Sequence, residues 1–208
     1  MLALPFEHWT PLGDKNMLSE FCVKCWHNPV PPDSVMIFNS SEKRAKYPDR
    51  LLVRECYRDL IRFIETDIAQ EADPFRGVVV TGQPGIGKTF FGWYCIRYQC
   101  AQGRPVLYHR AKKNFLFYDS HVYEPKVSAT EEDLQTDIIE ILRPELPLWC
   151  IIDMLAVEEQ PSGFALDASW YPIQTTAPNP AWYWWGTVCQ RFTFFPLHCY
   201  RLTVIGIF

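Results

Sequence analysis

Short apolar runs alternate with stretches of helical period along most of this chain. The strand-like runs are residues 77–80, 106–109, 148–152, 170–176 and 192–195. The helix-like stretches, in which apolar residues recur every three or four positions, are residues 49–72, 88–101 and 130–143. Uninterrupted apolar runs are typical of strands buried on both faces of a parallel sheet, and their alternation with helices is typical of α/β proteins. We therefore predict a three-layer α/β domain with a mostly parallel sheet between two layers of helices.

Two segments depart from this alternation. Residues 1–48 mix aromatic side chains, prolines and polar runs without a sustained period. We therefore expect an irregular N-terminal extension there, followed by the main domain over residues 49–208. Residues 115–118 and 121–123 are two strand-like runs separated by an Asp-Ser pair at 119–120, which predicts a hairpin inserted between core elements.

Composition narrows the ligand classes. The 208-residue chain has a formal net charge of −4, so it lacks the basic field that binds nucleic acid through counterion release. No stretch approaches the roughly 18 apolar residues that a membrane-spanning helix needs, and the first residues lack the pattern of a signal peptide. We expect an intracellular protein of the cytoplasm or nucleus, with no membrane partner and without nucleic acid as its default ligand.

The residues that follow the apolar run 77–80 match a phosphate-binding pattern at every position. They are Gly82, Gln83, Pro84, Gly85, Ile86, Gly87, Lys88 and Thr89, in the order G-x-x-x-x-G-K-[ST]. Glycines let the backbone bend without a Cβ clash, so that successive N–H groups point at anionic oxygens, and the following helix adds its positive dipole end. The pattern lies between a strand-like run and a helix-like stretch, which is the context that it requires. This predicts a P-loop that binds a nucleoside triphosphate, with ATP as the expected ligand.

Lys88 and Thr89 supply the chemistry of this loop, and Asp153 is expected to complete it. The lysine would neutralise the β- and γ-phosphates, and the threonine hydroxyl would ligate Mg2+. Asp153 ends the apolar run 148–152, and a carboxylate at the carboxyl end of a neighbouring buried strand can hold the same ion through water. Lys88 and Asp153 are thus the candidate catalytic residues, and Thr89 and Asp153 the candidate Mg2+ ligands. A turn aspartate after a core strand is the alternative interpretation of Asp153.

The residues after Asp153 limit the expected catalysis. Many ATPases of this group follow the aspartate with a glutamate that orients the attacking water, whereas here the next residue is Met154. Glu158 and Glu159 could replace that glutamate only if their loop folds back toward the γ-phosphate, and a solvated loop is the alternative. We therefore expect slow hydrolysis, with turnover that depends on an arginine from a second subunit.

A second candidate site is formed by Cys22 and Cys25 with His27, which have the pair spacing of a zinc knuckle. A structural zinc site needs four ligands, and no second pair of this kind follows in the sequence, where Cys56 is the nearest further thiol. We therefore favour reduced cysteines over a metal site.

Three stretches together resemble the P-loop NTPase region of fungal Crinkler-type and retrotransposon-hot-spot-type proteins. They are residues 57–64, residues 78–89 with the wording Gly-Gln-Pro-Gly-Ile-Gly-Lys-Thr, and residues 148–153 with the wording Leu-Trp-Cys-Ile-Ile-Asp. The resemblance covers about residues 49–196 and implies an ATPase domain of the additional-strand group, which in such proteins precedes a separate effector or nuclease-like domain. It also implies that Thr175 or Thr176 lies where related ATPases sense the γ-phosphate, with ordinary strand threonines as the alternative.

The chain departs from this family at two places. Where we expect the family to have Ser-Ser-Pro or Ala-Ser-Pro, this chain has Thr-Ala-Pro at 176–178, which removes one hydroxyl near the γ-phosphate. Beyond Pro196 the sequence no longer resembles the family's continuation, and no arginine-bearing lid follows. We therefore expect a P-loop NTPase fold that is truncated at the C-terminus.

Three functions remain open at this point. The first is an ATP-binding P-loop NTPase domain that hydrolyses ATP slowly with Mg2+. The second is a catalytically weak switch module of an effector-like protein, in which the nucleotide controls binding of a protein partner or self-association. A phosphotransferase ranks last, because such enzymes surround the transferred phosphate with several arginines and the downstream arginines here are scattered.

Overall fold

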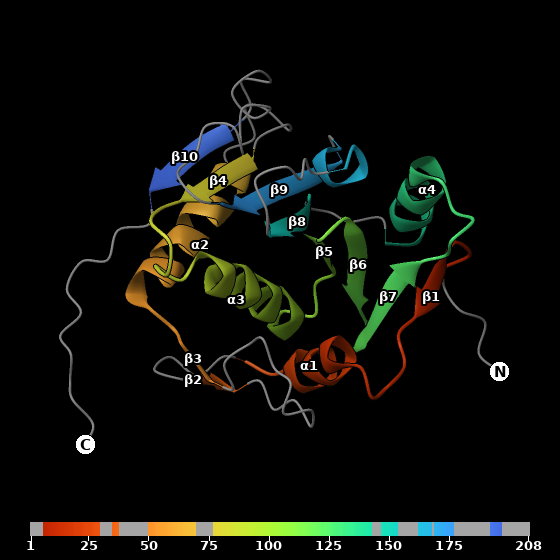
Figure 1. Cartoon of the computed structure of the whole chain (residues 1–208), viewed down its shortest axis with the longest axis horizontal. Coiled ribbons are helices and arrows are strands. Elements are labelled where there is room, and N and C mark those ends of the chain that lie inside the picture. The colour runs from red at the N-terminus through yellow and green to blue at the C-terminus, as the bar shows by residue number, and fades with distance from the viewer. Residues whose placement is uncertain are drawn as a thin grey trace.

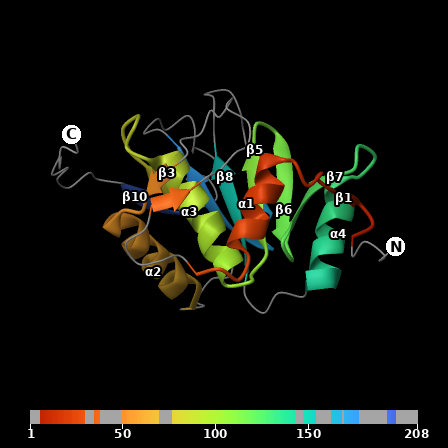
Figure 2. The ribbon, with the colours of Figure 1, turned by 90° about the horizontal axis from the view of Figure 1, so that it is seen from below.

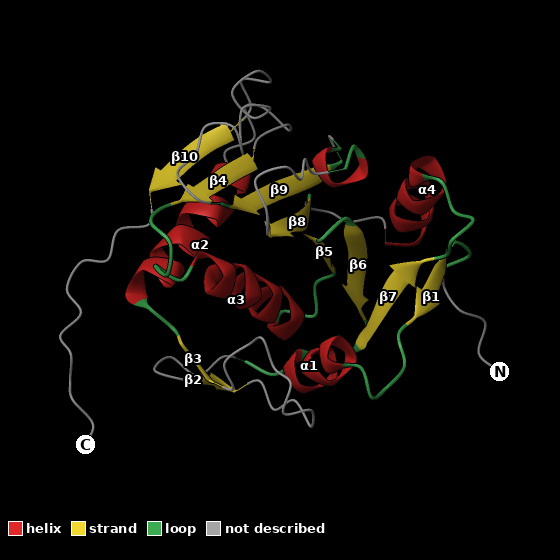
Figure 3. Cartoon of the chain, in the orientation of Figure 1, coloured by secondary structure: helices red, strands yellow, loops and turns green. Residues whose placement is uncertain are grey.

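The computed structural model describes residues 6–29, 35–37, 50–69, 77–142, 147–153, 162–167, 169–176 and 192–196. Within these residues the helices are α1 (Met17–Cys25), α2 (Glu55–Ala69), α3 (Lys88–Ala101), α4 (Glu131–Leu142) and the short 3-10 helix η1 (Phe164–Leu166). The strands are β1 (Trp9–Pro11), β2 (Val35–Ile37), β3 (Arg50–Leu52), β4 (Gly77–Thr81), β5 (Val106–Arg110), β6 (Lys113–Tyr118), β7 (His121–Pro125), β8 (Leu148–Asp153), β9 (Trp170–Thr175) and β10 (Phe192–Pro196). Helices and strands alternate along the chain, so the protein has an α/β fold, as predicted (Figure 3).

The main sheet contains eight strands in the order β1-β7-β6-β5-β8-β9-β4-β10. From β5 to β10 every neighbouring pair is parallel, whereas the pairs β5–β6, β6–β7 and β7–β1 are antiparallel. Strands β2 and β3 form a separate antiparallel pair. The sheet is therefore mixed, and the prediction of a mostly parallel sheet describes only the part from β5 to β10.

Two tight turns explain the antiparallel part of the sheet. Ala111 and Lys112 join β5 to β6 with φ angles of 49° and 62°, and Asp119 and Ser120 join β6 to β7 with φ angles of 47° and 64°. Two consecutive left-handed residues are typical of the turns that close two-residue hairpins. The second hairpin confirms the turn predicted at 119–120, whereas the first was not predicted.

Burial along the central strands follows from their apolar sequence. Every described side chain of β8 and β9 is buried, as expected for strands covered on both faces. Along β8, Trp149 and Ile151 belong to one hydrophobic cluster, whereas Cys150 and Ile152 belong to another. Because successive side chains of a strand point to opposite faces, these clusters lie on the two sides of the sheet.

Helices cover both faces of the sheet. The first cluster contains residues from α1, α2 and α3, which lie side by side below the sheet in Figure 1 and in front of it in Figure 2. The second cluster contains residues from α4 and η1, which lie on the other side of the sheet in Figure 1. Helix α3 packs in the middle of the first layer, since it contacts β5, β8, β9, α1 and α2.

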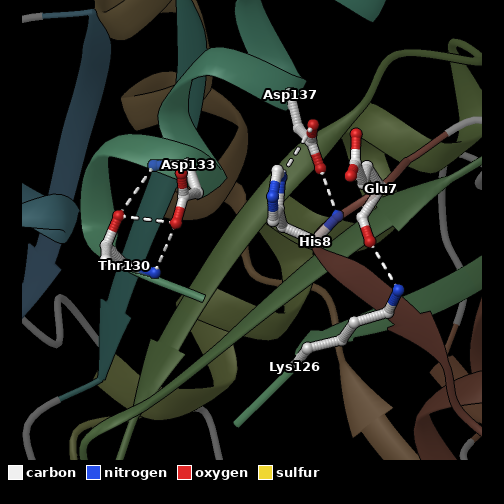
Figure 4. Close-up of polar contacts among 6 residues, drawn as sticks. All are labelled: Glu7, His8, Lys126, Thr130, Asp133 and Asp137. Carbon is white, nitrogen blue, oxygen red and sulfur yellow. Dashed lines mark hydrogen bonds and ion pairs between the residues drawn. The ribbon is translucent and has the colours of Figure 1, made fainter. Parts of the chain in front are cut away.

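Residues 6–29 are part of this fold, which corrects the expectation of an irregular extension over residues 1–48 for that part of the segment. Within its described residues, β1 pairs with β7 and α1 packs on α3. Asp137 of α4 also holds the segment: its carboxylate accepts a hydrogen bond from the backbone N of His8 at 2.6 Å and lies 3.2 Å from His8 Nδ1 (Figure 4). These elements were missed because a three-residue strand and a nine-residue helix are too short to show a sustained period.

Helix α4 begins after a reciprocal contact between Thr130 and Asp133. The backbone N and Oγ1 of Thr130 donate to Asp133 Oδ2 at 2.9 and 2.7 Å, and the backbone N of Asp133 donates to Thr130 Oγ1 at 3.2 Å (Figure 4). This reciprocal arrangement satisfies backbone donors that a helix start leaves without partners. The predicted helix over residues 49–72 begins only at Glu55, because Arg50–Leu52 form the strand β3, and the other predicted helices and strands are present with boundaries shifted by a few residues. The expected C-terminal truncation concerns residues 197–208, which lie outside the described residues.

Candidate functional site

The glycine loop, residues 82–89, joins the carboxyl end of β4 to the start of α3 (Figure 1). Gly85 and Gly87 have φ angles of 79° and 101°, which side-chain-bearing residues rarely adopt. Inside the loop, the backbone N of Ile86 donates to Gln83 O at 3.3 Å. The predicted loop therefore lies between a strand and a helix, and its glycines have the conformations for which glycine is needed.

Arg54, just before α2, and Tyr57, in its first turn, both donate hydrogen bonds to backbone carbonyls of the loop. Tyr57 is fully buried, and its hydroxyl donates to Gly87 O at 2.8 Å. Arg54, just before α2, donates through Nη1 to Ile86 O at 2.5 Å. A Cβ atom at Gly87 would lie 2.4 Å from the Tyr57 hydroxyl oxygen, so the loop and α2 are in close contact at this point.

Lys88 is folded back onto its own loop. Its Nζ donates to Gly82 O at 2.6 Å and to Gln83 O at 2.8 Å. Partial burial lowers the pKa of the Lys88 ammonium group from its ordinary value, because removal from water disfavours the charged form. The ammonium group is thus placed over the loop, on carbonyl oxygens that an anion could replace.

Asp153 is the last residue of β8, two strands away from β4, with β9 between them. Its side chain is only 4% exposed. Oδ1 lies 3.2 Å from Thr89 Oγ1 and 3.4 Å from Thr175 Oγ1. The structure therefore brings the predicted residues Thr89, Asp153 and Thr175 together at one edge of the sheet, because parallel strands end on the same side.

The other carboxylate oxygen of Asp153 contacts two residues of β5 that the sequence did not indicate. Tyr108 OH and Arg110 Nε both lie 3.5 Å from Oδ2. Burial raises the pKa of the Asp153 carboxyl above its ordinary value, and Arg110 and the neighbouring hydroxyls oppose that rise. The same burial, together with the negative charge of Asp153, raises the pKa of the Tyr108 hydroxyl.

The end of β9 lies beside the glycine loop. Thr176 is 2% exposed, and its backbone N donates to Val80 O of β4 at 3.1 Å. The hydroxyls of Thr81 and Thr176 are buried, and neither has a hydrogen-bond partner among the described residues. Buried hydroxyls normally have such partners, so these two are exceptions at the end of the strands that lead to the loop.

Comparisons with family models, with curated proteins and with solved structures found no match. The family resemblance therefore remains an expectation. Any function proposed for this chain rests on the local geometry alone.

Several sequence-based candidates lie elsewhere. Met154, Glu158 and Glu159 lie outside the described residues. Cys22 and Cys25 are buried in the hydrophobic cluster of α1, α2 and α3. Burial is the main cause that raises the pKa of the Cys25 thiol to about 11, so it favours the protonated form.

The described residues contain no group of three or more His, Cys, Asp or Glu side chains that could hold a metal ion. None of the helices described is long and apolar enough to cross a bilayer. A Mg2+ site of the kind predicted would not form such a group, because Mg2+ commonly takes one or two carboxylates and completes its shell with waters and substrate phosphates.

Proposed function

We propose that this chain is a P-loop NTPase domain that binds ATP on the glycine loop and hydrolyses it slowly. The observation that carries the proposal is the 3.2 Å contact between Thr89 Oγ1, at the start of α3, and Asp153 Oδ1, at the end of β8. A complete phosphate-binding pattern thus lies beside a buried carboxylate on another strand. Neither a turn aspartate nor a chance match to the pattern predicts this pairing.

The arrangement of the strands supports the same proposal. β4 leads into the loop, β8 ends at Asp153, and β9 lies between them and is parallel to both. A strand inserted at this place agrees with the additional-strand group that the resemblance implies. Helices on both faces of the sheet are consistent with a three-layer P-loop fold.

Thr89 and Asp153 suit Mg2+ in their chemistry. Both offer oxygen atoms, which this hard cation prefers. The Asp153 carboxylate lies at the same edge of the sheet as the glycine loop. Bound with the nucleotide, the ion would neutralise charge that develops on the phosphates. Lys88 would exchange the carbonyls of Gly82 and Gln83 for phosphate oxygens, which accept a hydrogen bond from a cation more strongly.

Thr176 supplies a donor for the last phosphate or for the attacking water. Its hydroxyl is buried, lacks a partner among the described residues and follows β9 at the loop edge. This supports Thr176, rather than Thr175, as the residue that senses the γ-phosphate, because the Thr175 hydroxyl already contacts Asp153.

The proposal is tested by titrating the purified chain with a fluorescent ATP analogue, with and without Mg2+. Lys88→Ala should weaken binding by about 10- to 100-fold, the loss expected when a hydrogen bond to a charged group is removed. Lys113→Ala, an exposed lysine of β6, is the matched control and should bind like the parent. Equal affinity in the parent and Lys88→Ala would show that the site assignment is wrong.

The alternative is a switch module in which the nucleotide sets conformation without useful turnover. Met154, which follows Asp153 where many related ATPases have a glutamate, favours this alternative. Phosphate release measured beside the titration separates the two functions. Release that Lys88→Ala abolishes supports the ATPase, whereas Mg2+-dependent binding without release supports the switch.

A further inference from the structure

The ion pair between Arg110 and Asp153 brings a second cation into the candidate site. Arg110 ends β5 and Asp153 ends β8, and the parallel register pairs these two residues directly. Their side chains are 15% and 4% exposed, and Arg110 Nε lies 3.5 Å from Asp153 Oδ2. Asp153 is therefore buried and Arg110 largely buried, at the edge of the sheet that also carries the glycine loop.

Burial requires that the Asp153 carboxylate has a cationic partner, because an unpaired buried charge is strongly unfavourable. The contact with Arg110 is nevertheless long, since charge-assisted hydrogen bonds are commonly about 2.7–2.9 Å. Tyr108, Thr89 and Thr175 offer Asp153 three further hydroxyl contacts. Asp153 thus keeps hydroxyl donors when Arg110 leaves, and the arginine can be exchanged where another cation takes over its charge.

The position of Arg110 relative to the loop suggests what it exchanges for. Asp153 bridges the two elements: one carboxylate oxygen contacts Thr89, next to the loop lysine, and the other contacts Arg110. Only the carboxylate of Asp153 therefore separates the guanidinium group from the place where the loop would hold phosphates. Arginine is well suited to phosphate, because its planar group can donate two parallel hydrogen bonds to phosphate oxygens.

We propose that Arg110 is a nucleotide-contacting arginine supplied by the chain itself, which leaves Asp153 and turns its guanidinium group to the terminal phosphate of a bound triphosphate. This inference rests on the proposed function and deepens it. Arg110 would take the role that the sequence analysis assigned to an arginine from a second subunit. Asp153, once engaged by the cation of the nucleotide complex, no longer needs Arg110 for its charge balance.

The experiment compares Mg2+-dependent binding of ATP and ADP in the parent and in Arg110→Ala. Contact with the terminal phosphate predicts that Arg110→Ala weakens ATP binding by about 10- to 100-fold. ADP binding should change much less, and Arg110→Lys should restore part of the preference for ATP. Arg104→Ala is the matched control, because Arg104 precedes β5 and lies at the opposite end of that strand, where its partner is Glu65.

A second comparison removes the effect of leaving Asp153 unpaired. Asp153→Asn and the double variant Arg110→Gln/Asp153→Asn both lack the buried carboxylate, so their difference reports on the arginine alone. The inference predicts a lower ratio of ATP to ADP affinity in the double variant. An unchanged ratio in both comparisons would overturn it and assign Arg110 to charge balance only.

The failure of this inference can be distinguished from the failure of the proposed function. The role of Arg110 alone would be overturned by three results together: the parent binds ATP, Lys88→Ala loses ATP binding, and Arg110→Ala keeps the preference for ATP over ADP. Parent protein that binds neither nucleotide would overturn both proposals.

Discussion

Gly87 lies so close to Tyr57 that the loop should not tolerate even a methyl group there. A Cβ atom at Gly87 would be 2.4 Å from the Tyr57 hydroxyl oxygen, and the backbone φ is 101°. Tyr57 is fully buried and packs beside the rings of Phe91 and Tyr94, with centroid distances of 5.5 and 5.8 Å. The ring therefore has little room to withdraw, and withdrawal would break its 2.8 Å hydrogen bond to Gly87 O.

Gly87→Ala should therefore lower the free energy of unfolding by roughly 3–6 kcal/mol. About 1–2 kcal/mol comes from placing a Cβ at positive φ. Displacing a packed side chain costs typically 1–3 kcal/mol, and losing the hydrogen bond costs about 1 kcal/mol more. Gly85→Ala is the matched control: its φ is also positive, at 79°, but a Cβ there meets nothing within 4 Å, so only the backbone cost applies.

Urea denaturation of the two alanine variants, followed by circular dichroism, measures this difference. Tyr57→Phe removes the clashing oxygen, so Gly87→Ala should cost clearly less in that background than in the parent. The reasoning would be refuted if Gly87→Ala cost no more than Gly85→Ala. A cost of Gly87→Ala that is the same with Tyr57 and with Phe at position 57 would refute it equally.

Two further predictions concern α4 and the segment that it holds. The hydrogen bonds from Thr130 lower the pKa of Asp133 below its ordinary value of 3.8. The ionised Asp133 therefore stabilises the fold above that pH, and this stabilisation is lost as the pH falls through the lowered pKa. Asp133→Ala should thus be less stable than the parent at neutral pH and equally stable in strong acid, as shown by thermal unfolding at several pH values, with the exposed Glu132→Ala as control. Asp137→Ala should cost about 1–3 kcal/mol, because it removes both contacts to His8. Hydrogen exchange should then become faster in β1, and unchanged exchange there would contradict the role of Asp137.

The sequence predicts the parallel part of the sheet because its strands are buried on both faces. Strands β4 and β8 are apolar up to their last residue, so their pattern reflects their burial directly. The turn between β5 and β6 carries no comparable signal: Ala111 and Lys112 adopt positive φ, although asparagine and glycine are the residues that favour such turns. Tertiary contacts must therefore impose this hairpin.

The residues of the candidate site also fall into those that the sequence could predict and those that it could not. The loop and Asp153 could be predicted because a motif or a strand end places them. Arg54 and Tyr57 could not, because their contacts with the loop join residues about 30 positions apart, as the separations of 32 and 30 show. Arg110 could have been found: extending the run 106–109 by one residue places it at the same sheet edge as Asp153, by the rule that predicted Asp153 itself.

The contacts around the loop also determine how a measured affinity for a nucleoside triphosphate would be interpreted. Lys88 is paired with loop carbonyls and Asp153 with Arg110, so the charged groups of the site have partners inside the protein. Triphosphate binding would therefore exchange hydrogen bonds rather than add them, and the measured affinity would be the difference between the two sets. In the proposed exchange, Lys88 would move within its own loop and Arg110 would turn away from Asp153, so that two side chains would rotate and the sheet would keep its arrangement. A preference for ATP over ADP would then depend mainly on Arg110, whereas affinity for both nucleotides would depend on Lys88.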